Sequence, residues 1–302
     1  MIKQLICLIG PTGVGKTDIS IKLAQSLNTE IVSCDSRQMF QEMSIGTAVP
    51  DVKQLDKVKH HFIQTISIHN YYSVYEYELN ALSCLEKLFS TKDKVILTGG
   101  SGLYLDALLY GMDDIPDPDP IIRQELEERY QKEGLDNIRF ELKKLDPEYY
   151  DEVDKRNYKR IIRGLEVCLT TGKTFSYFRR RSLRKRDFEH SIICLDRDRS
   201  ILHERINSRT DQMVQDGLID EARSLHHLKH LNALKTVGYR ELFDAFDGNI
   251  SEETAIELIK RNSRRYARRQ ITWNKRYKDA VWFNAINEEE VLSHVLNQSA
   301  EG

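Results

Sequence analysis

The sequence predicts an α/β fold in which a parallel sheet core is interrupted by an all-helical insertion domain. Short apolar runs of strand length alternate with helical patterns up to residue 112 and again from residue 191. Residues 113–190 show helical periodicity without a strand pattern, and the alternating prolines of Ile115–Pro120 separate them from the first part. We therefore expect a core formed by residues 1–112 and 191–302 and a helical domain at 113–190.

Composition points to an ordinary soluble protein. The chain has 302 residues, 40% hydrophobic residues and a net charge of −2, which by itself indicates no particular partner. Its five cysteines are scattered and form no C-x-x-C pair, which favours reduced thiols over disulfides or zinc ligands. The first apolar run is too short for a signal peptide, and no run reaches transmembrane length. We expect a cytoplasmic protein without a membrane partner.

A phosphate-binding motif lies near the N-terminus. Residues Gly10–Thr17 read GPTGVGKT and match G-x-x-x-x-G-K-[ST] at every specified position. The apolar run Leu5–Ile9 precedes the motif, and a helical pattern follows it to about Asn28, so the context is strand, turn and helix. This context predicts a P-loop NTPase-like core, in which the Thr17 hydroxyl holds Mg²⁺. The expected phosphate-binding residues are Gly10, Pro11, Thr12, Gly13, Val14, Gly15, Lys16 and Thr17.

Two further strand ends carry candidate site residues. The strand Ile31–Cys34 runs into Asp35–Gln38, and ligands bind at the carboxyl ends of strands in such sheets. Asp35 is open to three interpretations: a Mg²⁺ ligand, a general base close to the phosphates, or a carboxylate that caps the next turn. The strand Val95–Thr98 runs into Gly99–Tyr104, where a glycine pair either lets the backbone approach a ligand or forms a plain turn.

The insertion domain has segregated charge. Its predicted helices cover residues 121–131, 138–145, 147–153 and 158–171. Residues 113–154 hold 15 acidic and 6 basic residues, whereas residues 155–190 hold 3 acidic and 12 basic ones. The basic half includes Arg179–Arg181 beside Tyr177 and Phe178, a composition that fits either an RNA backbone site or a solvated helical face with a basic loop.

The sheet pattern resumes after the insertion. The run Ile192–Leu195 predicts a strand, and the helix after it places Arg205 and Arg209 on one face at i,i+4 spacing. Arginines on such a helix are suited to cover bound phosphates. A later helix carries a basic stripe, Arg261–Arg268, that predicts a second RNA contact.

Taken together, these segments resemble the tRNA dimethylallyltransferases of bacterial type, also called tRNA isopentenyltransferases. The matching segments occur in the family's order over about residues 5–283 and are Gly10–Thr17, Asp35–Gln38, Ile45–Pro50, Gly99–Tyr104, Thr236–Glu241 and Arg264–Trp273. Phe40, Ser44 and Val49 stand where the family commonly has Tyr, Asp and Lys.

The resemblance implies a reaction. A dimethylallyl group would pass from dimethylallyl diphosphate to N6 of the adenosine on the 3′ side of a tRNA anticodon, which forms N6-(dimethylallyl)adenosine with Mg²⁺ as cofactor. The implied catalytic residues are Thr17, Asp35 as general base, Ser101 and Arg209. The implied tRNA contacts are Asp35, Ser36, Arg37, Gln38, Ser101, Arg123, Lys159, Arg160, Ile161, Ile162 and Arg163. We expect a monomer.

Three other functions share parts of this pattern. A nucleotide or small-molecule kinase would also have a phosphate loop and arginines above it, although the basic insertion argues against it. An isopentenyltransferase that acts on free AMP or ADP would not need an RNA surface. A non-enzymatic RNA-binding ATPase would need a second metal-binding carboxylate, for which Asp196 is the candidate.

Overall fold

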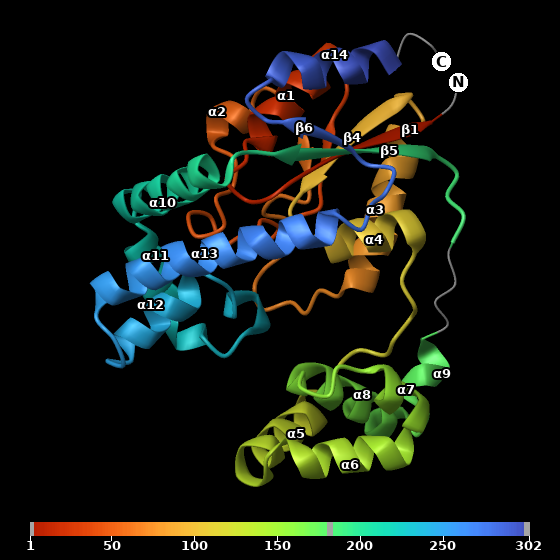
Figure 1. Ribbon diagram of the computed structural model, residues 1–302, viewed down its shortest axis with the longest axis vertical. Coiled ribbons are helices and arrows are strands. Elements are labelled where there is room, and N and C mark those ends of the chain that lie inside the picture. The colour runs from red at the N-terminus through yellow and green to blue at the C-terminus, as the bar shows by residue number, and fades with distance from the viewer. Residues whose placement is uncertain (1–2, 180–183, 299–302) are drawn as a thin grey trace. The chain divides into compact units, whose positions relative to one another are not determined.

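The computed structural model describes residues 3–179 and 184–298. The chain divides into two compact units. The core unit comprises Met1–Leu109 and Arg186–Gly302, and the helical unit comprises Tyr110–Lys185. Both units are shown in Figure 1.

The core unit is built on a parallel sheet with the strand order β3-β2-β4-β1-β5-β6. Its strands are β1 (Gln4–Ile9), β2 (Ile31–Ser33), β3 (His60–His61), β4 (Lys94–Gly99), β5 (Glu189–Asp196) and β6 (Val281–Asn284). Strand β1 lies in the middle, where Ile9 is level with Gly99 of β4 and Cys194 of β5. All the pairings are parallel, so the loops that follow these strands meet at one edge of the sheet.

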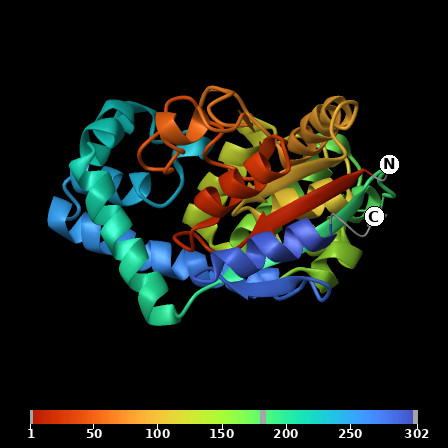
Figure 2. The same ribbon diagram turned by 90° about the horizontal axis from the view of Figure 1, so that it is seen from above.

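Helices cover both faces of this sheet. The helices of the core unit are α1 (Lys16–Ser26), α2 (Val52–Leu55), α3 (Val74–Leu88), α4 (Gly102–Tyr110), α10 (Arg199–Gln215), α11 (Leu218–Leu225), α12 (Tyr239–Phe246), α13 (Glu252–Asn274) and α14 (Glu288–Gln298), with short 3₁₀ turns η1 (His226–Leu228) and η2 (Asn232–Leu234). Helices α1 and α14 lie on one face, and α3, α4 and α13 on the other (Figure 1; Figure 2 from above).

Alternation along β1 explains why both faces are covered. Ile6 and Leu8 pack in a cluster with Leu23 of α1 and Val291 of α14. Leu5 and Cys7 point to the opposite face and are equally buried. A strand that is apolar on both faces must lie inside a parallel sheet, which fits the continuous apolar run predicted as a strand.

The helical unit is a small all-helical bundle. Its helices are α5 (Pro120–Glu133), α6 (Leu135–Leu145), α7 (Pro147–Glu152), α8 (Tyr158–Thr171) and α9 (Phe175–Phe178). Local sequence signals explain their ends, because Asp119, Asp146 and Asn157 cap the starts of α5, α7 and α8, and Gly172 ends α8 with a positive φ. The bundle has its own apolar core, centred on Leu126, Ile138, Leu142, Ile161 and Leu165.

The unit boundaries differ from the predicted ones. The sequence prediction placed residues up to 190 in the insertion, but the core unit resumes at Arg186. Arg186 donates to the buried carboxylate of Glu78 (2.7 Å) and to the carbonyls of Ala107 and Leu108 (2.8 Å each), so it is part of the core packing. Strand β5 also begins earlier than predicted, since Glu189 pairs with Gln4 of β1.

Within residues 3–179 and 184–298, no helix is long and apolar enough to cross a bilayer. The five cysteines are free thiols, and four of them are buried. Arg180 and Arg181 of the predicted basic loop lie outside the described residues.

Candidate functional site

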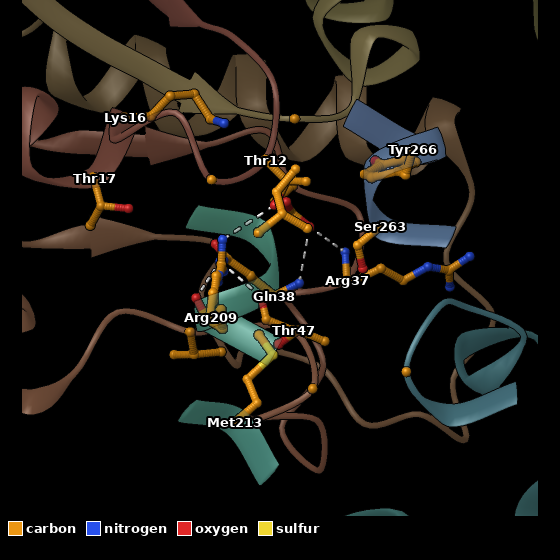
Figure 3. A pocket seen from close by; sticks show the side chains of 18 of the residues that line it. Thr12, Lys16, Thr17, Arg37, Gln38, Thr47, Arg209, Met213, Ser263 and Tyr266 are labelled. Atoms are coloured by element: carbon orange, nitrogen blue, oxygen red, sulfur yellow. Dashed lines mark hydrogen bonds between the residues drawn. The ribbon is translucent and has the colours of Figure 1, made fainter. Parts of the chain in front are cut away.

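A cavity of about 1110 Å³ opens in the core unit at the carboxyl ends of β1, β2 and β4. Its walls come from the Gly10–Thr17 loop, from Asp35–Gln38, from the loop around Gly46, and from helices α10 and α13. Figure 3 shows side chains from these segments pointing into a shared space. The parallel sheet therefore brings together three of the strand-end segments that the sequence singled out.

The Gly10–Thr17 loop is shaped to receive an anion. Gly13 and Gly15 have φ values of +80° and +113°, which side-chain-bearing residues rarely adopt. Gly15 is the N-cap of α1, and no side chain caps this end, so the first N–H groups of α1 remain available to an anion. A Cβ at Gly13 would lie 2.9 Å from the Ile206 side chain of α10, so this helix packs directly on the loop.

Five of the eight predicted phosphate-binding residues line the cavity: Thr12, Gly13, Gly15, Lys16 and Thr17. The side chain of Val14 points away from it and is buried in the apolar cluster under α1. Gly10 and Pro11 contribute their carbonyls, which accept hydrogen bonds from Lys16 Nζ at 2.9 and 3.0 Å.

Burial lowers the pKa of Lys16 to about 8. This value includes the effect of the Asp35 carboxylate, which raises the pKa, and the smaller effect of Arg209, which lowers it. The ammonium group is folded back onto the carbonyls of its own loop. A phosphate in the loop would replace these carbonyl contacts with a full negative charge.

Three arginines contact the same loop. Arg209 Nη1 donates to Thr12 Oγ1 at 3.2 Å, and Arg205 Nε donates to the Gly13 carbonyl at 2.8 Å. Both come from α10, as their i,i+4 spacing predicted. Arg197 Nη2 donates to the Val14 carbonyl at 3.3 Å. Arg197 was missed from the sequence because it lies in the short connection between β5 and α10, where no periodic pattern marks it.

Asp35 caps a turn and also lines the cavity. Its Oδ1 accepts hydrogen bonds from the N–H groups of Arg37 (2.9 Å) and Gln38 (3.3 Å), which is the turn-capping role that the sequence left open. Its Oδ2 accepts no hydrogen bond from the described residues. Burial lowers the pKa of both Lys16 and Arg209, and the Asp35 carboxylate opposes this shift, so its charge acts on both groups. One oxygen thus holds the turn while the other remains available to a ligand.

Ser101 joins the ends of β2 and β4. Its hydroxyl accepts the Ser36 N–H at 2.9 Å and donates to Ser36 Oγ at 2.9 Å, while its own N–H donates to the Cys34 carbonyl at 3.2 Å. Tyr266 of α13 lies beside Ser101, and burial raises its pKa to about 12. The resemblance pointed to Ser101 but assigned no role to Tyr266.

Arg37 and Gln38 bind parts of their own chain. Arg37 Nη1 donates to the carbonyls of Asn232 (3.3 Å) and Ala233 (3.2 Å). Gln38 Nε2 donates to the carbonyls of Thr47 (3.2 Å) and Ala48 (2.8 Å). Both side chains line the cavity, where they hold the surrounding loops in place.

Glu221 of α11 holds the loop at Ser44–Gly46. Its carboxylate accepts the three consecutive N–H groups of Ser44, Ile45 and Gly46 at 2.8–2.9 Å and the Tyr239 hydroxyl at 2.6 Å. Converging backbone N–H groups of this kind form an anion-binding nest, which here is filled by a carboxylate of the same chain. The sequence carried no signal for this contact, because the partners are about 175 positions apart.

In the helical unit, the prediction that Ile161 and Ile162 contact tRNA is wrong for their side chains. They are 0% and 2% exposed and belong to the apolar core of the bundle. Lys159 and Arg160, at the start of the same helix, are exposed. The start of α8 therefore exposes the two cations Lys159 and Arg160, whereas the isoleucines that follow them are buried.

Arg123 and Arg163 are bound within the helical unit. Both guanidinium groups donate to Glu166, whose side chain is fully buried, and Arg163 also donates to the Pro116 carbonyl. A buried carboxylate requires such partners, because an unpaired charge in the interior is strongly unfavourable. These ion pairs compete with the predicted tRNA contact of Arg123 and Arg163, which stays a prediction because the two side chains are still 32% and 24% exposed.

Among the described residues, no group of three or more His, Cys, Asp or Glu side chains is placed to hold a metal ion. The Thr17 hydroxyl lines the cavity at the start of α1. One hydroxyl suits Mg²⁺ that takes its other ligands from phosphate and water. The donor set therefore fits a metal that arrives with a phosphate ligand.

Fold and site define an α/β protein with a cavity suited to an anion. Comparison with known proteins gives its family. The sequence model of the IPP transferase family matches residues 38–277. The chain is 50% identical to tRNA dimethylallyltransferase 1 of Phocaeicola vulgatus over 98% of both chains, and 49% identical to its namesake of Bacteroides fragilis over 97% of both chains.

A solved structure agrees with this match. The crystal structure of a tRNA isopentenylpyrophosphate transferase from Bacillus halodurans is similar with a TM-score of 0.72 at 34% identity and covers 99% of this chain and 97% of its own. The chain belongs to the IPP transferase family and is a transferase.

Proposed function

We propose that this protein transfers the dimethylallyl group of dimethylallyl diphosphate to N6 of the adenosine on the 3′ side of the anticodon in tRNAs. The products are N6-(dimethylallyl)adenosine and diphosphate. One observation carries the proposal: the cavity combines the Gly10–Thr17 loop, with Lys16 and Arg209 beside it, and the Asp35 carboxylate. An anion-binding wall and a proton-accepting wall are what this reaction requires.

The anion-binding wall suits the leaving group. When the bond between the allylic carbon and its oxygen breaks, negative charge develops on the departing diphosphate. The N–H groups at the start of α1, Lys16 and Arg209 would stabilise that charge. We further propose that the core unit is of the P-loop NTPase type and that Thr17 holds Mg²⁺ on the diphosphate, where the ion would neutralise charge.

The part of the cavity that is lined by Asp35 suits the nucleophile. The exocyclic amine of adenine is a weak nucleophile because its lone pair is delocalised into the ring. A base must therefore take its proton as the N6–carbon bond forms. We assign this role to Asp35, whose Oδ2 accepts no hydrogen bond from the described residues. The adenosine must leave its stack to reach the cavity. There the Asp35–Gln38 turn and Ser101 would hold the base.

The RNA is expected to bind beyond the cavity as well. We propose that the helical unit contacts tRNA phosphates through Lys159 and Arg160, which are exposed at the start of α8. We also propose that the protein is a cytoplasmic monomer.

The other functions considered from the sequence have less support. Asp196, the candidate carboxylate of an ATPase, accepts the Arg197 N–H at 2.8 Å and does not line the cavity. An enzyme for free AMP or ADP would use the same cavity but would have no need of Lys159 and Arg160. A kinase is distinguished by experiment below.

Two measurements test the proposal. Purified protein, dimethylallyl diphosphate, Mg²⁺ and unmodified tRNA are combined, and the digested nucleosides are analysed by mass spectrometry. The expected product is N6-(dimethylallyl)adenosine in the tRNA and none from free AMP. Labelled ATP replaces the prenyl donor in a parallel reaction, and phosphorylated product at roughly 1–100 per second would indicate a kinase instead.

A further inference from the structure

Gln270 of α13 connects the two walls of the cavity. Its side-chain carbonyl Oε1 accepts the Thr12 N–H at 2.8 Å, and its amide Nε2 donates to the Gly100 carbonyl at 2.9 Å. Thr12 belongs to the loop after β1 and Gly100 to the loop after β4, two strands that are neighbours in the sheet. One side chain that is only 6% exposed thus spans both loops.

The chemistry of both contacts calls for an amide. Thr12 offers a donor and Gly100 an acceptor, so the bridging side chain must accept at one atom and donate at the other. Glutamate can only accept when ionised, and lysine can only donate. Among side chains of this length, glutamine satisfies both partners without taking up a proton, and leaving a buried backbone group unpaired is costly.

Gly100 is fitted to the same contact. A Cβ at Gly100 would lie 2.3 Å from Gln270 Nε2, far inside van der Waals contact. The glycine pair after β4 was predicted either to approach a ligand or to form a plain turn. In the structure, Gly100 leaves room for Gln270, and Gly99 leaves room for the Cys34 backbone, which a Cβ would meet at 2.5 Å.

Each loop that Gln270 holds carries a group of the proposed reaction. Thr12 Oγ1 accepts a hydrogen bond from Arg209, on the diphosphate side. Gly100 is followed by Ser101, whose hydroxyl holds Ser36 next to Asp35 on the adenosine side. The Gln270 amide therefore links the loop that carries Thr12 to the loop that carries Ser101.

We propose that Gln270 is a positioning residue, which sets the distance between the prenyl diphosphate and the adenosine that attacks it. This inference rests on the proposed function. Gln270 also lines the cavity. Its Oε1 and Nε2 are already engaged by Thr12 and Gly100, so we expect neither ligand to depend on this amide for binding. The transfer step needs both ligands in register, and a displacement of about 1 Å can cost about 10²-fold in rate.

The test compares Gln270→Glu, Gln270→Met and Gly100→Ala with the unaltered protein. The glutamate keeps the acceptor for Thr12 and loses the donor for Gly100, the methionine loses both, and the alanine displaces Nε2. Gln25→Glu makes the same chemical change at an exposed position of α1 and serves as the matched control. Single-turnover transfer is measured per mole of diphosphate-binding sites, so unfolded protein does not count.

We expect the three variants to transfer the prenyl group roughly 10- to 100-fold more slowly, while the dissociation constants of inorganic diphosphate and of tRNA change less than about twofold. The Gln25→Glu protein should match the unaltered one. Equal rates in all variants, or a rate loss that is matched by weaker binding of either ligand, would overturn the inference.

A double variant tests the contact between Gln270 and Gly100 itself. Gln270→Ala vacates the space that a Cβ at position 100 needs, so adding Gly100→Ala to it should cost little more than Gln270→Ala alone. Additive losses would overturn the proposed contact. If the unaltered protein forms no prenylated adenosine at all, the proposed function is wrong. Failure of the Gln270 inference is different, because the unaltered protein would then be active and the variants would transfer at the same rate.

Discussion

Raising the pH through 8 should weaken the binding of inorganic diphosphate, because the free protein loses the charge of Lys16 in this range. Burial lowers the pKa of this lysine to about 8 in the free protein. The ammonium form is therefore nearly complete at pH 7 and largely absent at pH 9. Bound diphosphate favours the charged form and holds the proton on Lys16 over the whole range.

The size of the effect follows from that pKa. If only the charged form binds well, the dissociation constant rises in proportion as the fraction of charged lysine falls. Between pH 7 and pH 9 the dissociation constant should therefore rise about tenfold. At pH 8 about half of the free protein carries the proton, so binding should take up about half a proton per site. Isothermal titration in two buffers that differ in ionisation enthalpy measures this uptake directly.

A Lys16→Arg variant provides the control, because a guanidinium group stays charged throughout this range. The ionisation of diphosphate itself affects both proteins equally, so the difference between their pH profiles reports Lys16 alone. Identical profiles in the two proteins, together with no proton uptake at pH 8 by the unaltered one, would refute the reasoning.

Three further changes test other parts of the site. Asp35→Asn keeps the oxygen that caps the turn but cannot accept a proton, so single-turnover transfer should fall by roughly 10²–10⁴-fold while tRNA still binds; recovery of the rate at high Mg²⁺ would instead identify Asp35 as a metal ligand. Arg160→Ala should reduce the slope of log tRNA affinity against log salt by about one unit, whereas Arg163→Ala should leave the slope unchanged because Glu166 already holds its guanidinium. Glu221→Ala should raise the KM for tRNA by releasing the Ser44–Gly46 loop, and added acetate should restore it; no rescue at any acetate concentration would count against the nest.

Local patterns carried most of the fold prediction. Strand and helix positions follow from periodicity and capping residues, and Gly172 or Asp146 can be recognised without knowing what packs on them. The Gly10–Thr17 loop was also predictable from a local pattern, because its glycines and the first residues of α1 lie within eight consecutive residues. Arg205 and Arg209 were found because both lie one turn apart on a single helix.

The remaining contacts depend on residues that are distant in sequence. A basic residue on a striped helix has the same pattern whether it faces solvent, like Arg160, or neutralises a buried carboxylate, as Arg163 does for Glu166. Glu221 and Gln270 reach their partners only after α11 and α13 have packed, so no local pattern marks them.

The position of β1 in the sheet has a consequence for the growing polypeptide. The Gly10–Thr17 loop is among the first segments to be synthesised, yet the groups that surround it, from Arg197 to Gln270, are encoded after the helical unit. Until β5 emerges, one edge of β1 has no partner, and an unpaired apolar strand edge invites association with other chains. A chain that ends before α13 therefore contains the Gly10–Thr17 loop but lacks Gln270, which links this loop to Gly100.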